Sequence, residues 1–308
     1  MDAVVLENAS KIFGETEALK RVSFAVPQGC CLALIGHNGA GKTTLMKLIL
    51  GLATPTAGRV SVLGCDPASA GKAFRKQLGF LPENVSFHDE MTGADTIAFY
   101  ARLKGVGVRD GEKLLERVGL AHAAKRRVKT YSKGMRQRLG LAQTLLGKPR
   151  LLLLDEPTTG LDPLLRQEFF QIIKDLTAAG TTVILSSHVL TELEARTDLA
   201  AIMRDGKLAA FGDLDTLRAK AGLPVIVRAR GDVAAISGRL NGAFHKIIGP
   251  DSASIEIDCP QDEKMKLLRK LAECGDICSD VEVRQPSLDD LYLFYCGRSL
   301  NAAGEGGL

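Results

Sequence analysis

A glycine-rich segment at residues 36–43, Gly-His-Asn-Gly-Ala-Gly-Lys-Thr, has the residue types and spacing of a loop that binds phosphate groups. Its glycines let backbone N–H groups converge on phosphate oxygens at the start of a helix, where the helix dipole favours anions. A tight turn without a ligand is the alternative, but the apolar residues 30–35 predict a strand before the loop and residues 44–50 predict a helix after it. Lys42 would reach the β- and γ-phosphates of a nucleotide, and Thr43 would coordinate Mg²⁺. The expected nucleotide contacts in this segment are Gly36, Asn38, Gly39, Gly41, Lys42, Thr43 and Thr44.

Two adjacent carboxylates, Asp155 and Glu156, end the apolar run at residues 151–154. A continuous apolar run is typical of a strand buried on both faces. Such a strand would bring Asp155 to Mg²⁺ beside the phosphate loop and would place Glu156 to polarise an attacking water. Adjacent acids at a strand end are more often helix caps or surface groups, so the functional interpretation depends on the preceding phosphate loop.

A second helix start suited to phosphate lies at residues 131–138, Tyr-Ser-Lys-Gly-Met-Arg-Gln-Arg. Ser132 is a good N-cap residue, and Gly134 lets the backbone approach a ligand. The surrounding residues 125–138 hold seven basic side chains and no acidic one. A nucleic-acid patch is one interpretation, but only Tyr131 is aromatic there, which favours a solvated or phosphate-facing surface and no nucleic-acid partner.

Together these motifs resemble the ATP-binding subunits of ABC transporters, over residues 1 to about 220. Residues 131–138 resemble the family's signature motif, residues 159–162 its D-loop with Asp162, and His188 its switch histidine. The resemblance implies an ATPase that uses ATP and Mg²⁺, with Glu156 and His188 as catalytic residues. It also implies a head-to-tail homodimer. The residues expected to contact the partner's nucleotide are Ser132, Gly134 and Gln137.

The sequence departs from the family pattern at several positions. Lys133 and Met135 stand where the family usually has Gly and Gln, and Glu83 replaces the usual Q-loop glutamine. A carboxylate can still bind Mg²⁺ or water, so Glu83 is included with Thr43 and Asp155 as an expected Mg²⁺ ligand. Phe13 lies where the family stacks an aromatic ring on adenine, although taken alone it is more typical of a core residue.

Several segments are similar to the Nos-type subunits that support maturation of copper-containing nitrous-oxide reductase. They include His37 and residues 81–85, 128–138 and 285–292. This resemblance implies an integral membrane permease, an accessory periplasmic protein of the same system, and a location on the cytoplasmic face of the inner membrane. A drug or lipid exporter is the alternative. A soluble ABC ATPase of translation or DNA repair is less favoured, because the chain has one cassette and neither an internal repeat nor a heptad run.

The elements that must position these residues alternate as strands and helices along residues 1–220, which predicts an α/β domain with a mainly parallel sheet. The expected strands are residues 22–26, 30–35, 151–154 and 182–186, and the expected helices are residues 42–50, 110–118, 134–146 and 163–176. Residues 199–203 and 207–211 flank Asp205-Gly206 and predict a hairpin.

The pattern changes at residues 224–296, which we expect to form a small α+β accessory or regulatory domain. The order is strand 225–229, helix 233–240, strands 244–248 and 254–257, helix 262–272 and strand 281–284. This βαββαβ order predicts a ferredoxin-like unit. A last helix is expected from Ser287, and residues 297–308 are expected to be a flexible tail.

The composition bounds the remaining classes. With 308 residues and 45% hydrophobic residues, the chain is expected to form two packed domains, and 25% charged residues is ordinary for a globular protein. Residues 1–222 hold 30 basic and 23 acidic side chains, whereas residues 223–308 hold 10 and 13, which predicts different partners for the two parts. The longest stretch without a charged side chain, residues 22–41, contains Pro27 and four glycines and is not expected to span a membrane. The N-terminal residues do not show the basic segment that is typical of a secretory signal, so a cytoplasmic location is expected.

The seven cysteines are expected to be reduced thiols rather than a disulfide framework. Cys274 and Cys278 have a spacing that could form a thiolate site for Cu(I) on one helix face. Gly275 argues against this geometry, because it is expected to end the helix before Cys278. We therefore expect that the chain itself binds no copper.

Overall fold

The computed structural model describes residues 1–240, 245–248 and 253–297. The chain forms two compact units, Met1–Gly212 and Asp213–Leu308. The division lies before the position near residue 220 that the sequence pattern predicts. The reason is that helix α8 (Leu214–Ala221) packs against α11 (Leu288–Tyr295), where the hydroxyl of Tyr295 donates a hydrogen bond to the carbonyl of Leu217 at 3.0 Å.

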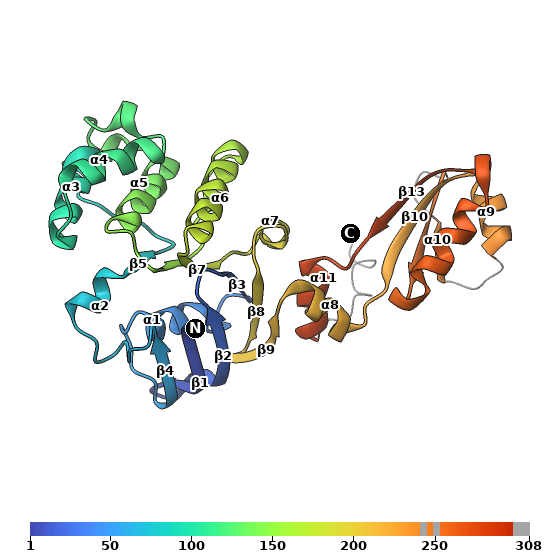
Figure 1. Ribbon diagram of the computed structural model, residues 1–308, viewed down its shortest axis with the longest axis horizontal. Coiled ribbons are helices and arrows are strands. Elements are labelled where there is room, and N and C mark those ends of the chain that lie inside the picture. The colour runs from blue at the N-terminus through green and yellow to red at the C-terminus, as the bar shows by residue number, and fades with distance from the viewer. Residues whose placement is uncertain (241–244, 249–252, 298–308) are drawn as a thin grey trace. The chain divides into compact units, whose positions relative to one another are not determined.

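The first unit is built on a six-stranded sheet (Figure 1). In spatial order its strands are β5 (Leu78–Leu81), β6 (Leu151–Leu154), β7 (Thr182–Ser186), β3 (Cys31–Ile35), β8 (Leu199–Arg204) and β9 (Lys207–Gly212). All neighbouring pairs are parallel except β8 and β9. Every residue of β3, β6 and β7 is buried, as expected for central strands covered on both faces. Because these strands run in one direction, the residues that follow them meet at one edge.

A three-stranded antiparallel sheet packs with the first sheet around helix α1 (Lys42–Ile49). Its order is β2 (Thr16–Pro27), β1 (Asp2–Phe13) and β4 (Ala57–Val62). One hydrophobic core joins both sheets and α1, with Val4, Leu45 and Leu34 among its buried members. This packing fixes where α1 begins and therefore where the phosphate loop ends.

The remaining helices of the first unit are α2 (Lys72–Lys76), α3 (Gly93–Lys104), α4 (Val108–Arg117), α5 (Lys133–Leu145), α6 (Pro163–Ala178) and α7 (Leu190–Glu194). Helices α3, α4 and α5 pack against one another. The strands and helices predicted for this unit are present with ends that differ by at most two residues, except that β2 is much longer than residues 22–26. Asp205 and Gly206 have φ values of 50° and 78°, as the predicted hairpin turn requires. Helix α3 was not predicted, although Thr92 and Asp95 form a capping box at its start.

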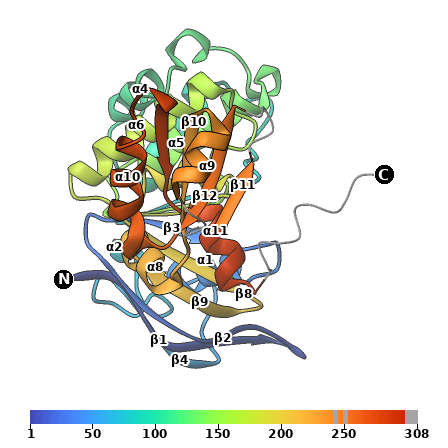
Figure 2. The same ribbon diagram turned by 90° about the vertical axis from the view of Figure 1, so that its right-hand side faces the viewer.

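The second unit has the predicted βαββαβ order. Its elements are β10 (Val225–Gly231), α9 (Val233–Leu240), β11 (His245–Ile248), β12 (Ser254–Cys259), α10 (Lys264–Ala272) and β13 (Cys278–Arg284). The sheet order is β11-β12-β10-β13, with every neighbouring pair antiparallel. Helices α9 and α10 bury Ile236 and Leu267 against Val227 and Ile257, so they cover one face of this sheet (Figure 2).

Three details of the second unit bear on the sequence predictions. The predicted helix from Ser287 is α11, with Ser287 and Asp290 forming its capping box. Phe244, the first residue of a predicted strand, and residues 298–308 of the expected tail lie outside the described residues. Among the described residues, short 3-10 turns lie at Ala121–Ala123 and Val128–Thr130 of the first unit and at Gln261–Glu263 and Gly275–Ile277 of the second.

In the part of the chain that the structure describes, no helix combines the length and the apolar character needed to cross a bilayer.

Candidate functional site

The glycine-rich segment forms a tight loop between β3 and α1. Gly39 and Gly41 have φ values of 86° and 102°, which other residues adopt only with strain. A Cβ atom on Gly36 would lie 2.7 Å from the carbonyl oxygen of Met203, and one on Gly41 would lie 2.8 Å from that of Ala18. The loop conformation therefore depends on glycine, and Gly41 places the first turn of α1 at the edge of the sheet.

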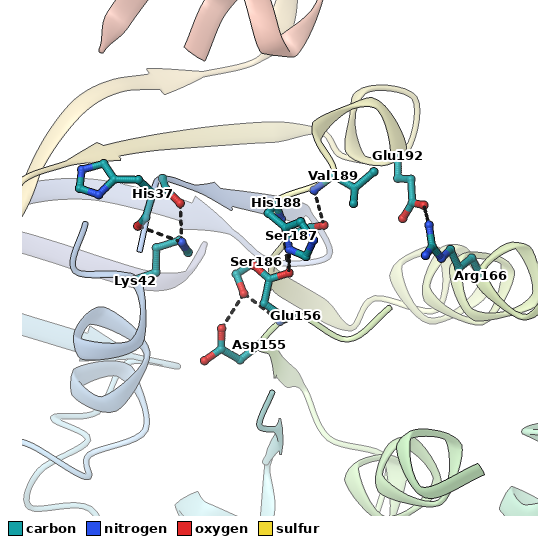
Figure 3. A network of polar contacts seen from close by, with 11 residues as sticks. His37, Lys42, Asp155, Glu156, Arg166, Ser186, Ser187, His188, Val189 and Glu192 are labelled. Atoms are coloured by element: carbon teal, nitrogen blue, oxygen red, sulfur yellow. Dashed lines mark hydrogen bonds and ion pairs between the residues drawn. The ribbon is translucent and has the colours of Figure 1, made fainter. Parts of the chain in front are cut away.

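Lys42 extends back over this loop (Figure 3). Its ammonium group donates hydrogen bonds to the carbonyl of Gly36 and, at 3.3 Å, to that of His37. Burial lowers the pKa of Lys42, and the nearby carboxylates of Glu156, Asp155 and Glu83 oppose this effect. A partly desolvated cation at the start of a helix is suited to bind a polyanion.

Asp155 and Thr43 meet beside the loop although they lie 112 residues apart. The Thr43 hydroxyl lies 3.4 Å from Asp155 Oδ2, and the buried Ser186 hydroxyl donates to Asp155 Oδ1 at 2.6 Å. The same Ser186 oxygen accepts a hydrogen bond from the backbone N–H of Glu156 at 3.0 Å. Ser186 was not predicted as a site residue. A serine that ends a fully buried strand needs a hydrogen-bond partner, and that was the available signal.

Glu156 is held by His188, a contact that was not predicted from the sequence. Nδ1 of His188 lies 2.7 Å from Glu156 Oε2, and the backbone N–H of His188 donates to the same oxygen at 3.3 Å (Figure 3). The Glu156 side chain is 14% exposed and the His188 side chain 69%. Glu156 has a φ of 48°, a backbone conformation that is uncommon outside glycine and that concentrates at functional sites. The arrangement presents one oriented carboxylate to the space above Lys42.

A cavity of about 460 Å³ lies in front of these groups. It is lined by most of the predicted residues of the phosphate loop and by Glu83, Asp155 and Glu156. Thr16, Glu17 and Lys20 of β2 and Asp205 of the β8–β9 hairpin also line it and were not predicted. His37 Nε2 lies 3.4 Å from Asp205 Oδ1, which links the loop to the hairpin. The size and the opposed charges suit a ligand that carries both phosphate and a cation.

The donor set fits Mg²⁺ in chemical type. The hydroxyl of Thr43 and the carboxylates of Asp155 and Glu83 are hard oxygen ligands, which Mg²⁺ prefers. Dedicated protein cages for Mg²⁺ are uncommon, and phosphates of the ligand usually complete its coordination.

Phe13 is not a core residue, although an aromatic side chain taken alone would suggest one. It lies at the end of β1 with 48% of its surface exposed, and the Lys11 ammonium lies 4.9 Å from the centre of its ring. It is not among the residues that line the cavity. Its stacking on adenine stays a prediction.

The start of α5 presents Ser132 but not Gln137. Ser132 is exposed, and its hydroxyl accepts a hydrogen bond from the backbone N–H of Met135 at 3.2 Å, which caps the helix. Gly134 is buried, and a Cβ atom there would lie 3.4 Å from the carbonyl oxygen of Gly160. Gln137 is 4% exposed, because it lies one helical turn after Gly134 on the inner face of α5. Its contact with a partner's nucleotide stays a prediction.

Asp162 caps helix α6. Its carboxylate accepts a hydrogen bond from the backbone N–H of Leu165 at 2.9 Å, and Pro163 occupies the first helical position. The D-loop prediction therefore falls on an exposed helix cap, which leaves Asp162 at the surface of the unit.

The basic residues near α5 are partly neutralised within the unit. Arg127 and Lys129 pair with Glu90 at 3.0 and 2.8 Å, and Arg136 lies 4.0 Å from Asp89. These ion pairs support the interpretation of the segment as a solvated surface.

Comparisons with known proteins agree with this geometry. The family model described as ABC transporter matches residues 19–159. The chain is 34% identical over 306 residues to the daunorubicin resistance ATP-binding protein DrrA3 of Streptomyces coeruleorubidus, covering 96% of each chain. It is 31% identical over 310 residues to the Nod factor export ATP-binding protein I of Rhizobium etli, covering 97% of this chain and 95% of the relative.

Solved structures show the same fold. A structure of an ATP-binding subunit of an ABC transporter superposes with a TM-score of 0.67 and 31% identity, over 71% of this chain and 93% of that one. The chain thus belongs to the ATP-binding subunits of ABC transporters, the ATPases of these systems.

Proposed function

We propose that this chain powers an export-type ABC transporter through ATP-driven closure of a homodimer on the cytoplasmic face of a membrane, where it binds an integral membrane permease. The observation that carries this proposal is the Glu156 carboxylate, which His188 holds beside Lys42 and Asp155. An oriented carboxylate next to a phosphate-binding loop can activate water for attack on a terminal phosphate.

The phosphates of ATP would bind to backbone N–H groups of residues 36–44 and to Lys42. Thr43, Asp155 and Glu83 would hold Mg²⁺, which when bound neutralises charge on the phosphate oxygens. Ser186 fixes both the Asp155 carboxylate and the backbone of Glu156, so the two acids keep separate orientations.

Glu156 would accept the proton of the attacking water. Its Oε2 atom is occupied by two contacts with His188, and this leaves the carboxylate with one fixed orientation. In the tautomer that protonates Nδ1, His188 donates this hydrogen bond to Glu156.

The dimer part of the proposal is supported by the start of α5. Ser132 is exposed at a helix N-terminus, where backbone N–H groups can bind phosphate, and Gly134 adds no side chain. This end of α5 is not part of the cavity around Lys42. We infer that it serves the nucleotide of a second copy.

Export as the direction of transport is supported by relatives that match both units. Their printed names refer to daunorubicin resistance and to Nod factor export. The second candidate is the copper-enzyme role, with an accessory periplasmic protein, and the features that favour it are His37 and residues 128–138. The two candidate roles can be separated by identifying the membrane protein that co-purifies with this chain. If that membrane protein confers drug efflux in vesicles, the export role is supported. If deletion of this chain leaves nitrous-oxide reductase without copper, the copper-enzyme role is supported.

Substitution Glu156→Gln tests the ATPase site. The amide keeps the shape of the side chain but loses its charge, so turnover should fall by roughly two to four orders of magnitude. ATP binding should persist, and the dimer should stay closed in ATP and Mg²⁺. Glu168→Gln, on the exposed face of α6, is the matched control and should leave turnover unchanged. Near-normal turnover of Glu156→Gln would remove this residue from its assigned role.

A further inference from the structure

Arg166 connects two segments that flank the Glu156 and His188 pair (Figure 3). It lies in the first turn of α6. Its Nε donates a hydrogen bond to the carbonyl of Leu161 at 2.9 Å, and its Nη1 donates to Glu192 Oε1 at 2.7 Å. Leu161 precedes α6, whereas Glu192 lies in α7, which begins two residues after His188. One guanidinium group thus joins the segment before α6 to the helix after His188.

This contact is partly buried on both sides. The Arg166 side chain is 35% exposed and the Glu192 side chain 18%, so water screens the pair less than a surface ion pair. The second oxygen of Glu192, Oε2, is buried and has no hydrogen-bond partner among the described residues. The charge of Glu192 therefore depends on Arg166 for its compensation.

Helix α7 needs such an anchor. It has five residues, Leu190–Glu194, and no side chain caps its N-terminus. A helix of this length is not stable by its own hydrogen bonds and is held by tertiary contacts. Leu193 of this helix is fully buried, and the neighbouring Glu192 provides a polar contact to Arg166 of α6.

His188 depends on α7 for its position, because it precedes the helix and lies outside regular structure. Its side chain is largely exposed, and Glu156 is the partner that it contacts. A shift of α7 would therefore be transmitted to His188 and from there to the orientation of Glu156.

We propose that Arg166 is a positioning residue for ATP hydrolysis: by pairing with Glu192 and with the carbonyl of Leu161, it fixes α7 so that His188 stays in contact with Glu156. The inference rests on the proposed roles of Glu156 and His188 and adds a residue that touches neither of them. The planar fork of arginine matters, because the two contacts point to different segments through different nitrogen atoms.

The other end of the link reaches the start of α5. The segment at Gly160 and Leu161 packs against Gly134, where a Cβ atom would lie 3.4 Å from the Gly160 carbonyl oxygen and 3.5 Å from a Leu161 methyl group. Arg166 thus restrains a segment that contacts both α5 and α6. A side chain with a single charged nitrogen could not hold this segment and Glu192 at the same time.

The test measures kcat and KM for ATP, with ATP binding measured separately, in Arg166→Ala, Arg166→Lys and Glu192→Gln. Misplacement of a reacting group can cost up to about 100-fold in rate. We expect kcat of Arg166→Ala to fall roughly 10- to 100-fold while KM and the ATP dissociation constant change less than about twofold. Arg166→Lys should recover only part of kcat, because lysine cannot make both contacts.

A second background separates positioning from a general loss of structure. In His188→Ala, adding Arg166→Ala should cost little more, because the arginine acts through the histidine. As a control, Arg117→Ala removes a more exposed ion pair between Arg117 of α4 and Asp175 of α6, the helix that also holds Arg166. This variant should leave kcat unchanged. If Arg166→Ala does not fold, Arg166→Lys and Glu192→Gln are compared with wild type and in the His188→Ala background instead.

The outcomes distinguish the inference from the proposed function. Wild-type kcat in folded Arg166→Ala, or in both milder variants where it does not fold, overturns the inference. A full additional loss in the His188→Ala background also overturns it. If Glu156→Gln keeps its turnover, the proposed site fails instead, whatever Arg166 does.

Discussion

The two units of the chain differ in where their sheets gather polar side chains. In the first unit, the parallel strands β3, β6 and β7 end at one edge, and the residues that follow them place Lys42, Asp155 and His188 together. In the second unit, neighbouring strands are antiparallel and end at opposite edges. Sheet direction therefore decides which unit can build a polar site from strand ends.

Charges also have different uses in the two units. Lys42 faces three carboxylates across a cavity, and burial lowers its pKa. In the second unit Arg228 of β10 pairs with Glu256 of β12, directly opposite in the sheet register. The first arrangement leaves space for a ligand, whereas the second joins two strands. The described residues of neither unit contain a group of three or more His, Cys, Asp or Glu side chains that could hold a metal ion.

The largest effect in the first unit, after that of Glu156→Gln, is expected for Lys42→Ala. Loss of hydrogen bonds from a charged group costs about 1.5 to 3 kcal/mol, which corresponds to a roughly 10- to 150-fold weaker ATP affinity. Equilibrium titration with ATP measures the change. Lys47→Ala, on the exposed face of the same helix, should bind ATP normally. Unchanged affinity in Lys42→Ala would contradict the assignment of the loop.

Substitution Ser132→Arg should separate ATP binding from dimer closure. The larger side chain would fill the space before α5 that a partner's nucleotide is proposed to occupy, while the cavity around Lys42 stays intact. In the Glu156→Gln background, size-exclusion chromatography with ATP and Mg²⁺ should show loss of the dimer. Ser279→Arg, on an exposed position of β13 in the second unit, should leave the dimer unchanged. A closed dimer in both variants would refute the proposed arrangement of two copies.

A smaller effect is expected for Glu83→Gln. The amide removes one of three carboxylates facing Lys42, so the Mg²⁺ dependence of turnover should shift by less than roughly tenfold, or stimulation by the membrane partner should change. ATPase assays over a range of Mg²⁺ concentrations measure the shift, and a thermal melt confirms folding. Indifference in both assays would make Glu83 a loop residue without a role in the site.

No copper binding is expected at the cysteines of the second unit. Helix α10 ends at Ala272 and Cys278 begins β13, so Cys274 and Cys278 do not share a helix face. Cys274 is buried and donates to the carbonyl of Lys270, and burial raises the pKa of the Cys278 thiol, which disfavours the thiolate that binds metal. Metal analysis after incubation with Cu(I) under reducing conditions should find no stoichiometric site. Copper that is lost in Cys274→Ser or Cys278→Ser would contradict this prediction.

Much of the first unit could be predicted because its motifs are local. The phosphate loop, the acids after β6 and the Asp205-Gly206 turn each require particular residues at fixed spacing, and the structure places them as expected. The ferredoxin-like order of the second unit followed from hydrophobic periodicity in the same way. Strand β4 was missed, because it carries polar residues among its apolar ones and depends on pairing with β1.

Contacts between distant segments had no counterpart in the spacing of residues. Ser186 reaches Asp155, and Arg166 reaches Glu192, only because the sheet order brings β6 beside β7 and the packing of α6 brings it beside α7. The burial of Gln137 and the exposure of Phe13 were likewise decided by which face of an element the rest of the chain covers. Local sequence specifies loops, caps and turns through backbone geometry, whereas side-chain partners across the fold depend on strand order and packing, which no short segment contains.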